Sequence, residues 1–258
     1  MTNISIVIIT FNEEKNIRRC LESVKEIADE IVVVDSLSAD QTKSICQEFG
    51  ARFIEQKFSG YIEQKNFALD QAKNDYVLSL DADEAVSPEL AESIKQVKQE
   101  SVMDGYRMNR LTNFCGKWIR HGTWYPDTKL RLFNRKKARW GGINPHDKII
   151  MQEGSSVAQI KGDILHYSYH SIEELVAQMN HFTSIQAKAM YEQGRKAGSM
   201  NLLLNPLAAF ITGYFFKGGF LDGKEGFLIA RAVSYSTLIK YMKLLFLQRE
   251  KGSKKNQQ

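Results

Sequence analysis

Three carboxylates lie within four residues where an apolar run ends: Asp81, Asp83 and Glu84. The run at 76–80 has no helical spacing and is typical of a buried strand. A strand that ends in acids delivers them to the carboxyl edge of a sheet, where open α/β folds bind ligands. Clustered carboxylate oxygens suit Mg²⁺ or Mn²⁺, which usually shares its coordination shell with substrate phosphates. The alternative is that Asp81 and Asp83 only cap the following helix and face solvent.

Polar side chains also follow the two earliest apolar runs. Thr10, Asn12 and Glu13 follow the first run, and Asp35 ends the second. Amphipathic segments separate the runs, and Asn12 is expected to cap the first helix. Strand and helix thus alternate four times, which predicts a mostly parallel sheet covered by helices. Because the carboxyl ends of parallel strands share one edge, Asn12, Asp35 and Asp81 are expected to converge there. The predicted strands cover residues 4–9, 31–34, 51–54 and 76–80.

Between residues 106 and 169 the helical period disappears, and aromatic and basic residues alternate with turns. Trp118, Trp124 and Trp140 all fall in this part of the chain. Aromatic rings beside polar groups can stack on sugars while the polar groups bind their hydroxyls. Trp124 is therefore a candidate contact for a saccharide substrate. The alternative is that each tryptophan belongs to the core.

The composition of the 258-residue chain is that of an ordinary globular protein, with 43% hydrophobic and 25% charged residues. Its net charge of +5 is unevenly distributed along the chain, because residues 240–255 contain several lysines and one arginine but a single acid, Glu250. Such a basic end suits an anionic surface, either a membrane or a nucleic acid. The three cysteines are widely spaced and form no CxxC pair, which favours a reducing compartment. No signal-peptide pattern begins the chain, so a cytoplasmic location is expected.

The C-terminal third has a helical pattern. Ser171 and Glu174 form a capping box, and an apolar region follows at 202–216. It is interrupted by polar residues and Pro206, and no stretch reaches the roughly eighteen apolar residues of a spanning helix. Apolar residues with flanking lysines predict a helix pair in a membrane interface. The alternatives are a soluble helical subdomain and a dimer interface, so homo-oligomerisation stays open.

Taken together, three motifs resemble the inverting family 2 glycosyltransferases with a GT-A fold. They are Thr10-Phe11-Asn12-Glu13, Asp35 with Ser38 and Asp40, and Asp81-Ala82-Asp83. The resemblance covers residues 4–170 in motif order. The segment at 217–223, Lys-Gly-Gly-Phe-Leu-Asp-Gly, is similar to the β-1,4-glucosyltransferase-like branch that builds lipopolysaccharide or lipooligosaccharide cores.

The resemblance implies an α/β fold: a Rossmann-like, mostly parallel sheet flanked by helices, with a C-terminal helical membrane-associating extension. The expected domains are a glycosyltransferase domain at 1–170, a helical membrane-interface extension at 171–250 and a basic flexible tail at 251–258. Within the first domain, residues 1–100 would form the nucleotide-sugar half and residues 101–170 the acceptor half.

The resemblance also implies a role for each matched residue. Asn12, Glu13 and Asp35 would hold the base and ribose of the nucleotide, with Thr10 in the same turn. Lys65 and Asn66 would lie near the diphosphate.

The metal site follows from the same resemblance. Asp81 would contact ribose or metal-bound water, and Asp83 would ligate Mn²⁺ or Mg²⁺. His166 falls where many GT-A enzymes place a metal-binding histidine. The alternative is that His166 lies inside a strand and has its hydrogen bonds satisfied there.

The implied reaction is a single in-line displacement at the anomeric carbon of the sugar. The metal would offset the charge that grows on the leaving diphosphate, and one carboxylate would take the proton from the acceptor hydroxyl. The candidate base is Asp147, in a His-Asp pair one methylene shorter than the His-Glu of this branch. Asp127, in Trp-Tyr-Pro-Asp, is the alternative base.

Three other classes fit the sequence less well. A nucleotidyltransferase usually has a glycine-rich phosphate loop after its first strand, and a dinucleotide-binding oxidoreductase has GxGxxG there. A non-catalytic membrane-bound scaffold would use the basic tail but would not need converging acids. We therefore expect a metal-dependent inverting glycosyltransferase that moves glucose or a related hexose from a UDP-sugar to a glycolipid such as a lipopolysaccharide core. It would lie on the inner face of the cytoplasmic membrane and bind no nucleic acid.

Overall fold

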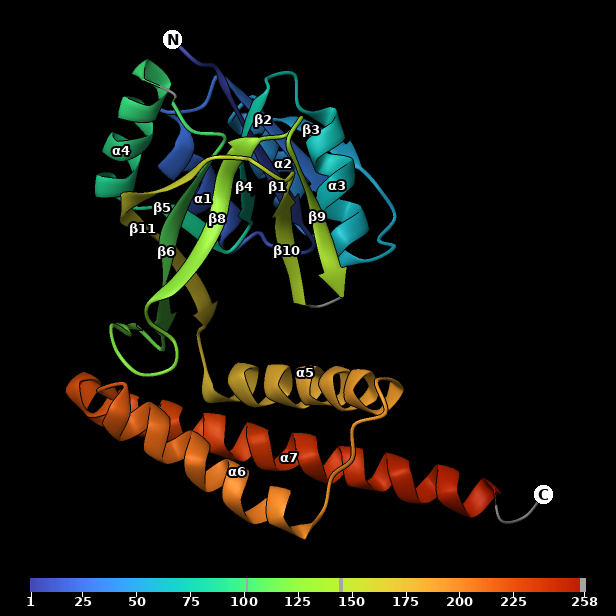
Figure 1. Cartoon of the computed structure of the whole chain (residues 1–258). Helices are drawn as coiled ribbons and strands as arrows, with labels where there is room; N and C mark the ends of the chain where they lie inside the picture. Colours follow the sequence, from blue (N-terminus) through green and yellow to red (C-terminus); the bar gives the residue numbers. More distant parts are fainter. Residues whose placement is uncertain (101, 144–145, 256–258) are drawn as a thin grey trace. The chain divides into compact units, whose positions relative to one another are not determined.

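The computed structural model describes residues 1–100, 102–143 and 146–255, and the chain forms two compact units (Figure 1). The first, here called the sheet unit, comprises Met1–Leu111 and Asp127–Ser168. The second, the helical unit, comprises Thr112–Pro126 and Tyr169–Gln258. Residues 256–258 of the expected basic tail lie outside the described residues.

The sheet unit is built on one mixed sheet. Its strands follow the order β3-β2-β1-β4-β8-β6-β11-β5, and β7 pairs with β6. The first four strands in this order are parallel to one another, β8 pairs antiparallel with both β4 and β6, and β5 pairs antiparallel with β11. A separate antiparallel hairpin consists of β9 and β10. The strands are β1 (Ile4–Thr10), β2 (Glu30–Asp35), β3 (Arg52–Glu55), β4 (Tyr76–Asp81), β5 (Glu84–Val86), β6 (Gly105–Phe114), β7 (Lys117–Trp118), β8 (Asp127–Asn134), β9 (Ala138–Ile143), β10 (His146–Met151) and β11 (Val157–Tyr169).

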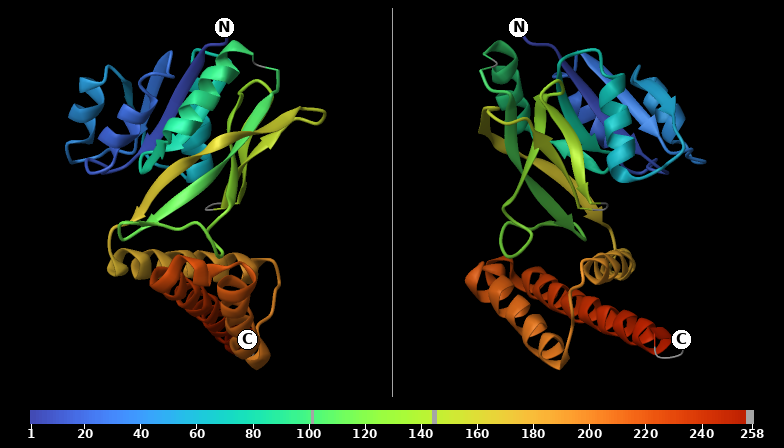
Figure 2. Two further views of the ribbon diagram at one scale, coloured as in Figure 1. Left: turned by 90° about the vertical axis from the view of Figure 1, so that its left-hand side faces the viewer. Right: turned by 45° about the vertical axis from the view of Figure 1, so that its right-hand side comes forward.

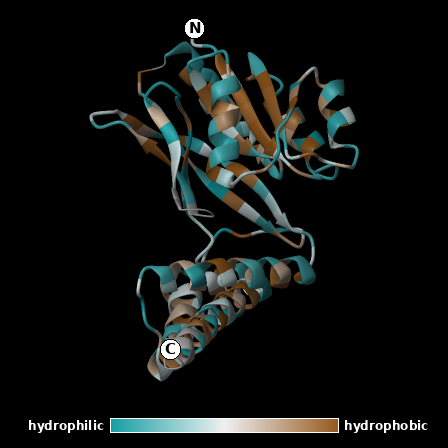
Figure 3. Cartoon of the chain, turned by 90° about the vertical axis from the view of Figure 1, so that its right-hand side faces the viewer, coloured by the Kyte–Doolittle hydropathy of each residue, from teal (hydrophilic) through white to brown (hydrophobic). Residues whose placement is uncertain are grey.

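Both faces of the parallel part are covered, which explains its uninterrupted apolar runs. Alternate residues of β1 point to opposite faces, so Ile6 and Ile8 pack with one core cluster and Val7 with the other. The first cluster includes residues of α1 (Ile17–Val24), α2 (Thr42–Glu48) and α4 (Pro88–Gln99). The second includes residues of α3 (Tyr61–Gln71) and of the β9–β10 hairpin. Figure 3 shows hydrophobic colours along the central strands.

The four predicted alternations of strand and helix are present in the first hundred residues. Ser87 caps α4 as its position before Pro88 predicts, because its Oγ accepts the N–H of Leu90 at 3.2 Å. The sheet becomes mixed after residue 104, because β8 runs antiparallel to its neighbours β4 and β6. This is the region in which the sequence loses its helical period.

Among the residues that the structure describes, five helical segments of the helical unit follow β11. They are α5 (Ile172–Glu192), α6 (Ser199–Ile211), a π-helix η1 (Thr212–Phe216), a 3₁₀-helix η2 (Gly219–Asp222) and α7 (Gly223–Lys255). The predicted cap of α5 is confirmed, since Ser171 Oγ accepts the N–H of Glu174 at 3.2 Å. Helices α6 and α7 lie side by side and are joined through η1 and η2 (Figure 2).

Glycines allow a close approach of the segments that join α6 to α7. A Cβ on Gly226 would lie 1.8 Å from the carbonyl oxygen of Gly219. A Cβ on Gly219 would in turn lie 2.7 Å from the carbonyl oxygen of Gly213. Both distances are too short for any side chain, so the glycine-rich segment at 217–226 is a packing motif of the helical unit.

The glycine-rich segment at 217–226 also forms hydrogen bonds with residues 112–126. Asp222 is buried, and its carboxylate accepts the N–H groups of Arg120 at 3.1 Å and of His121 at 2.8 Å. Lys117 Nζ donates to the carbonyl oxygen of Asp222 at 2.6 Å and pairs with Glu225 at 2.8 Å. These contacts place residues 112–126 in the helical unit although they precede β8 in sequence.

One segment of the described residues, Ser199–Phe216, is long and apolar enough to cross a membrane by length and composition alone. The apolar residues of this segment are interrupted by Asn205, Pro206 and Gly213. Only 6% of the segment is buried within the structure.

Candidate active site

The carboxyl ends of β2, β1 and β4 meet at one edge of the sheet, as the sequence predicts. Thr10 pairs with Asp35 across β1 and β2, and Ile9 pairs with Asp81 across β1 and β4. The turns that follow these strands are therefore neighbours, and the polar residues in them can act on one ligand.

Asn12 connects two of these turns. Its backbone is left-handed, with φ of 54°, a conformation that asparagine tolerates better than most residues. Its N–H donates to Ser38 Oγ at 2.7 Å, and its Oδ1 accepts the N–H of Ala39 at 2.9 Å. The prediction that Asn12 caps α1 is therefore wrong, because α1 begins at Ile17 and its side chain serves the neighbouring turn instead.

Asp35 is buried at the end of β2 and fixes the same turn. Its carboxylate accepts the N–H of Ser38 at 2.7 Å and also the Ser38 hydroxyl. Thr10 is buried as well, and its Oγ1 has no hydrogen-bond partner within the described ranges. The predicted nucleotide side thus has a rigid frame of Asn12, Ser38 and Asp35.

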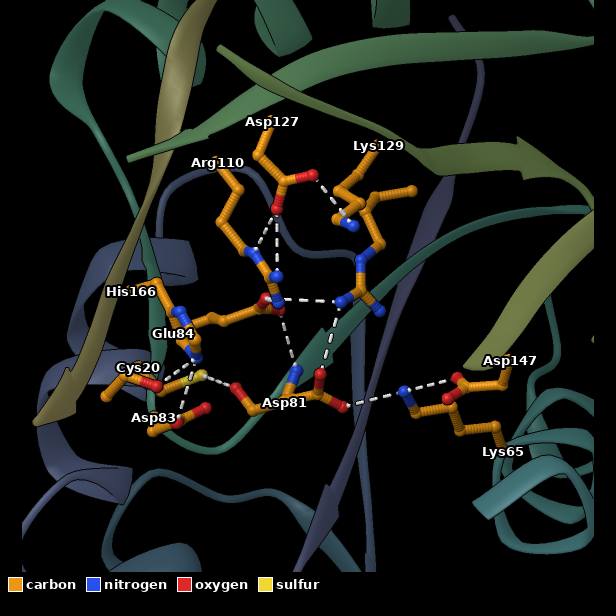
Figure 4. A network of polar contacts seen from close by, with 12 residues as sticks. Cys20, Lys65, Asp81, Asp83, Glu84, Arg110, Asp127, Lys129, Asp147 and His166 are labelled. Atoms are coloured by element: carbon orange, nitrogen blue, oxygen red, sulfur yellow. Dashed lines mark hydrogen bonds and ion pairs between the residues drawn. The ribbon is translucent and has the colours of Figure 1, made fainter. Parts of the chain in front are cut away.

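Asp81 lies between two buried cations. Lys65 Nζ is 3.1 Å from its Oδ1, and Arg131 Nη2 is 3.1 Å from its Oδ2 (Figure 4). Desolvation by the surrounding protein favours the neutral carboxyl. The two cations outweigh this effect and hold the pKa of Asp81 well below its usual range. Asp81 is therefore a fixed negative charge.

Glu84 organises the other side of this turn. Its side chain is fully buried and pairs with Arg131 at 3.1 Å and Arg110 at 3.4 Å. It also accepts the N–H of Asp81 at 3.0 Å, which fixes the backbone of the acidic turn. From the sequence, Glu84 is only one of three clustered carboxylates, and neither Arg110 nor Arg131 has an expected role. The sequence does contain one indication of this pairing. Arg131 lies between apolar residues of β8, and an arginine in such a strand can neutralise a buried acid.

Trp140 packs against both cations of Asp81. It is buried, with Lys65 Nζ 4.4 Å and Arg131 Cζ 5.2 Å from its ring centroid. Asn66 bonds to the backbone of Trp140 twice, through its Nδ2 at 2.9 Å and its Oδ1 at 3.0 Å. Asn66 thus attaches α3 to β9. The burial of Trp140 agrees with the alternative expected from the sequence, in which this tryptophan belongs to the core.

Asp83 and Glu13 form a second acidic group near the same turn. Asp83 Oδ2 is 3.1 Å from His166 Nε2, which projects from β11 (Figure 4). Burial raises the pKa of Glu13 to about 7, the hydrogen bond from Asn16 opposes this rise, and the negative charges of Asp83, Asp40 and Asp81 add to it. Glu13 is therefore a desolvated carboxyl beside other acids, and a cation bound there would stabilise their charged forms.

The donor set at Asp83 and His166 fits part of a divalent-metal site. Among the residues that the structure describes, no three His, Cys, Asp or Glu side chains gather closely enough to hold a metal by themselves. A carboxylate and an imidazole are suitable ligands for Mn²⁺, and such metals commonly complete their shell with phosphate oxygens and water. The arrangement is consistent with a metal that is bound together with a diphosphate.

The two candidate bases have different partners. Asp147 pairs with Lys65 at 2.8 Å, and its side chain is 12% exposed. Asp127 pairs with Arg110 at 2.8 Å and with Lys129 at 2.9 Å. Burial would raise the pKa of Asp127, but Arg110 and Lys129 lower it below the usual value.

Trp124 lies in the helical unit, whereas every other predicted site residue lies in the sheet unit. Its ring stacks on Tyr169 with centroids 5.2 Å apart and meets Phe114 edge-on at 5.9 Å. Trp124 is therefore a packing residue of the helical unit's core in this structure.

A mixed sheet flanked by helices, with acids at the carboxyl ends of its parallel strands, is a GT-A-like arrangement. A solved mannosyltransferase from Pyrobaculum calidifontis, in complex with GDP-Man and Mn²⁺, has this fold. The two chains share 15% identity with a TM-score of 0.55, over 94% of this chain and 87% of that one. The predicted GT-A fold and the presence of a C-terminal helical extension are confirmed.

The chain belongs to glycosyl transferase family 2, whose model matches residues 5–153. An uncharacterized glycosyltransferase of Rickettsia typhi is 34% identical over 95% of this chain and 87% of the relative. The lipopolysaccharide core biosynthesis glycosyltransferase LpsC of Rhizobium meliloti is 29% identical over 88% of this chain and 86% of the relative. The chain is thus a glycosyltransferase, and the nucleotidyltransferase, oxidoreductase and scaffold alternatives are set aside.

Proposed function

We propose that this glycosyltransferase is metal-dependent and inverting, and that it transfers a hexose from a nucleotide-diphosphate sugar to a glycolipid acceptor. UDP-glucose or a related UDP-sugar is the proposed donor, and a lipopolysaccharide core is the proposed acceptor. The observation that carries the proposal is the division of the site into a cationic side, Lys65 and Arg131, and an acidic side, Asp83 with Glu13. In a metal-bound diphosphate, the phosphates would pair with the cationic side and the metal with the acidic side.

The cationic side supports diphosphate binding. Nε and Nη1 of Arg131 are buried donors with no partner in the described part of the chain, and the same holds for Nε1 of Trp140. Buried donors without an acceptor cost free energy, so a bound anion would stabilise them. Lys65 supplies a further positive charge beside them.

The acidic side would hold the metal through Asp83 and His166. When bound, Mn²⁺ or Mg²⁺ would neutralise charge that develops on the leaving diphosphate. Thr10, Asn12, Glu13 and Asp35 would position the nucleoside from the adjoining turns.

Asp147 is the proposed base for the acceptor hydroxyl. It contacts one cation, Lys65, whereas Asp127 contacts two and has a lowered pKa. A general base needs a proton affinity suited to the working pH, and a carboxylate held by two cations is a weak base. A diphosphate that attracts Lys65 would loosen its pairing with Asp147 and leave that carboxylate available to the acceptor.

The acceptor is proposed from the similarity to LpsC, whose name assigns it to lipopolysaccharide core biosynthesis. Such acceptors are anchored in lipid, so the enzyme would work as a peripheral protein at the inner face of the cytoplasmic membrane. The apolar C-terminal helices support this location.

The test is release of nucleoside diphosphate from a panel of nucleotide sugars with Mn²⁺, Mg²⁺ or EDTA. We expect one donor to be hydrolysed, with loss of activity in EDTA and in Asp83→Ala. Asp75→Ala, which removes an exposed acid paired with Lys136, is the matched control and should retain activity. The anomer of the released sugar, followed by NMR before mutarotation, would report inversion. Absence of both turnover and metal-dependent binding across the panel would reject the proposal.

A further inference from the structure

Helix α6 presents an apolar stripe to the outside of the molecule. Met200, Leu203, Leu204 and Leu207 recur at the spacing of one helical face, and all four are exposed, Leu203 by 68%. The opposite side faces α7, because Pro206 is buried and its carbonyl oxygen accepts the hydroxyl of Ser234 at 2.8 Å. Most amphipathic helices bury their apolar face. In α6 an apolar face is left exposed instead.

The stripe continues into the turn between α6 and α7. Phe215 and Phe216, in the π-helix η1, are 57% and 82% exposed. The close packing of Gly213, Gly219 and Gly226 fixes this turn, so the rings are held outward by the backbone. A contiguous exposed apolar surface of this kind marks an interaction site.

The charges around the stripe identify the partner. Residues 197–221 contain no Asp or Glu, and exposed Arg195, Lys196 and Lys217 lie at either end of the apolar part. Basic residues that flank an apolar helical face match the headgroups of anionic lipids. Lysines are depleted at interfaces between protein subunits, so this pattern favours a bilayer over a second copy of the chain.

We propose that Met200, Leu203, Leu204, Leu207, Phe215 and Phe216 insert into the interfacial layer of an anionic bilayer, with α6 lying in the membrane plane. The proposal deepens the proposed function and rests on it where it concerns a lipid-anchored acceptor. It names the surface and the lipid charge that the glycosyltransferase would use. The basic residues at the ends of the stripe would contact lipid phosphates.

The experiment is co-sedimentation of the full chain with vesicles made of equal parts phosphatidylglycerol and phosphatidylcholine, compared with phosphatidylcholine alone. Leu203→Glu and Phe216→Glu place a carboxylate at the centre and at the end of the stripe. We expect each to weaken binding about tenfold or more, because a charged group must then enter the interface. Val102→Glu, which alters an exposed apolar residue of the sheet unit, is the matched control and should bind like wild type.

The vesicles contain neither donor nor acceptor, so their binding is independent of sugar transfer. Donor hydrolysis by the same variants should stay at the wild-type level, which separates failure of this proposal from failure of the proposed function. Equal binding of wild type and both variants would overturn the proposal. So would a wild-type dimer that the variants convert to monomer, or bound protein that resists alkaline carbonate as a spanning helix does.

Discussion

Lys65 forms an ion pair with Asp147, which lies 82 residues later in the chain, and 2.8 Å separates Nζ from Oδ2. The same ammonium group is 3.1 Å from Asp81. One buried cation of α3 therefore joins the acidic turn after β4 to the proposed base on β10. In the proposed mechanism, this position would couple donor binding to the ion pairing of the base.

Replacing Lys65 by methionine should impair both stability and catalysis. Asp81 and Asp147 would lose a shared cation in a largely buried setting, and breaking a buried ion pair typically costs about 3–5 kcal/mol. We expect a lower free energy of unfolding in urea and a nucleoside diphosphate release at least about tenfold slower, because the diphosphate also loses a cation. Lys43→Met is the control: its partner Glu55 is exposed, so the change should be below about 1 kcal/mol. Wild-type kinetics in Lys65→Met would contradict the proposed role.

Arg131→Met should be rescued in part by a second substitution, Glu84→Gln. The single change leaves Arg110, at 3.4 Å, as the remaining cation beside the fully buried Glu84, so we expect a loss of about 3 kcal/mol or more. Neutralising Glu84 removes the uncompensated charge. A double-mutant cycle of urea unfolding measures this coupling. If the two losses simply add, Arg131 does not act through Glu84.

Glu13 should make stability depend on pH. Its pKa in the fold is raised from the ordinary 4.5 to about 7, so between these values the folded protein binds more protons than the unfolded chain. The free energy of unfolding should therefore fall as pH rises from about 4.5 to about 7. We expect Glu13→Gln to flatten this dependence, measured by urea unfolding in EDTA. Glu22→Gln, which alters an exposed acid of α1, should leave the slope unchanged.

Gly226→Ala distinguishes helix propensity from close packing. Gly226 lies within α7, and propensity alone would stabilise the alanine variant by about 1 kcal/mol. Because its Cβ would lie 1.8 Å from the carbonyl oxygen of Gly219, we expect destabilisation of about 1–3 kcal/mol instead. Hydrogen exchange in α6 and α7 should report the loosening. Gly198→Ser, at an N-cap with open space around it, should not reduce protection. A more stable Gly226→Ala variant would refute the packing argument.

The sequence predicted the elements whose signals are local. The apolar runs of β1, β2 and β4 identified a sheet buried on both faces, and the polar residues after them located one edge. The caps at Ser87 and Ser171 predicted the starts of α4 and α5. Asn12 misled because its side chain accepts a hydrogen bond from a turn 27 residues away, and spacing alone does not distinguish that bond from a helix cap.

The site residues that the sequence did not predict are positioned by contacts between distant parts of the chain. Arg131 reaches Asp81 only because β8 pairs antiparallel with β4, with Leu78 opposite Leu132. No local pattern indicates that register. The grouping of residues 112–126 with the C-terminal helices likewise depends on Asp222, more than one hundred residues away. The packing of Trp124 against Tyr169 follows from that grouping.

The turn that carries Asp83 is also the link between two strands that are far apart in the sheet order. Only Ala82 and Asp83 separate β4 from β5, yet β8, β6 and β11 lie between those strands in the sheet. The turn is thus a short covalent tether that keeps the sheet curled, and β5 pairs with β11 so that Glu84 lies opposite His166. An inserted residue would shift that register and separate Asp83 from His166. The length of the turn is therefore fixed by the curvature that it maintains.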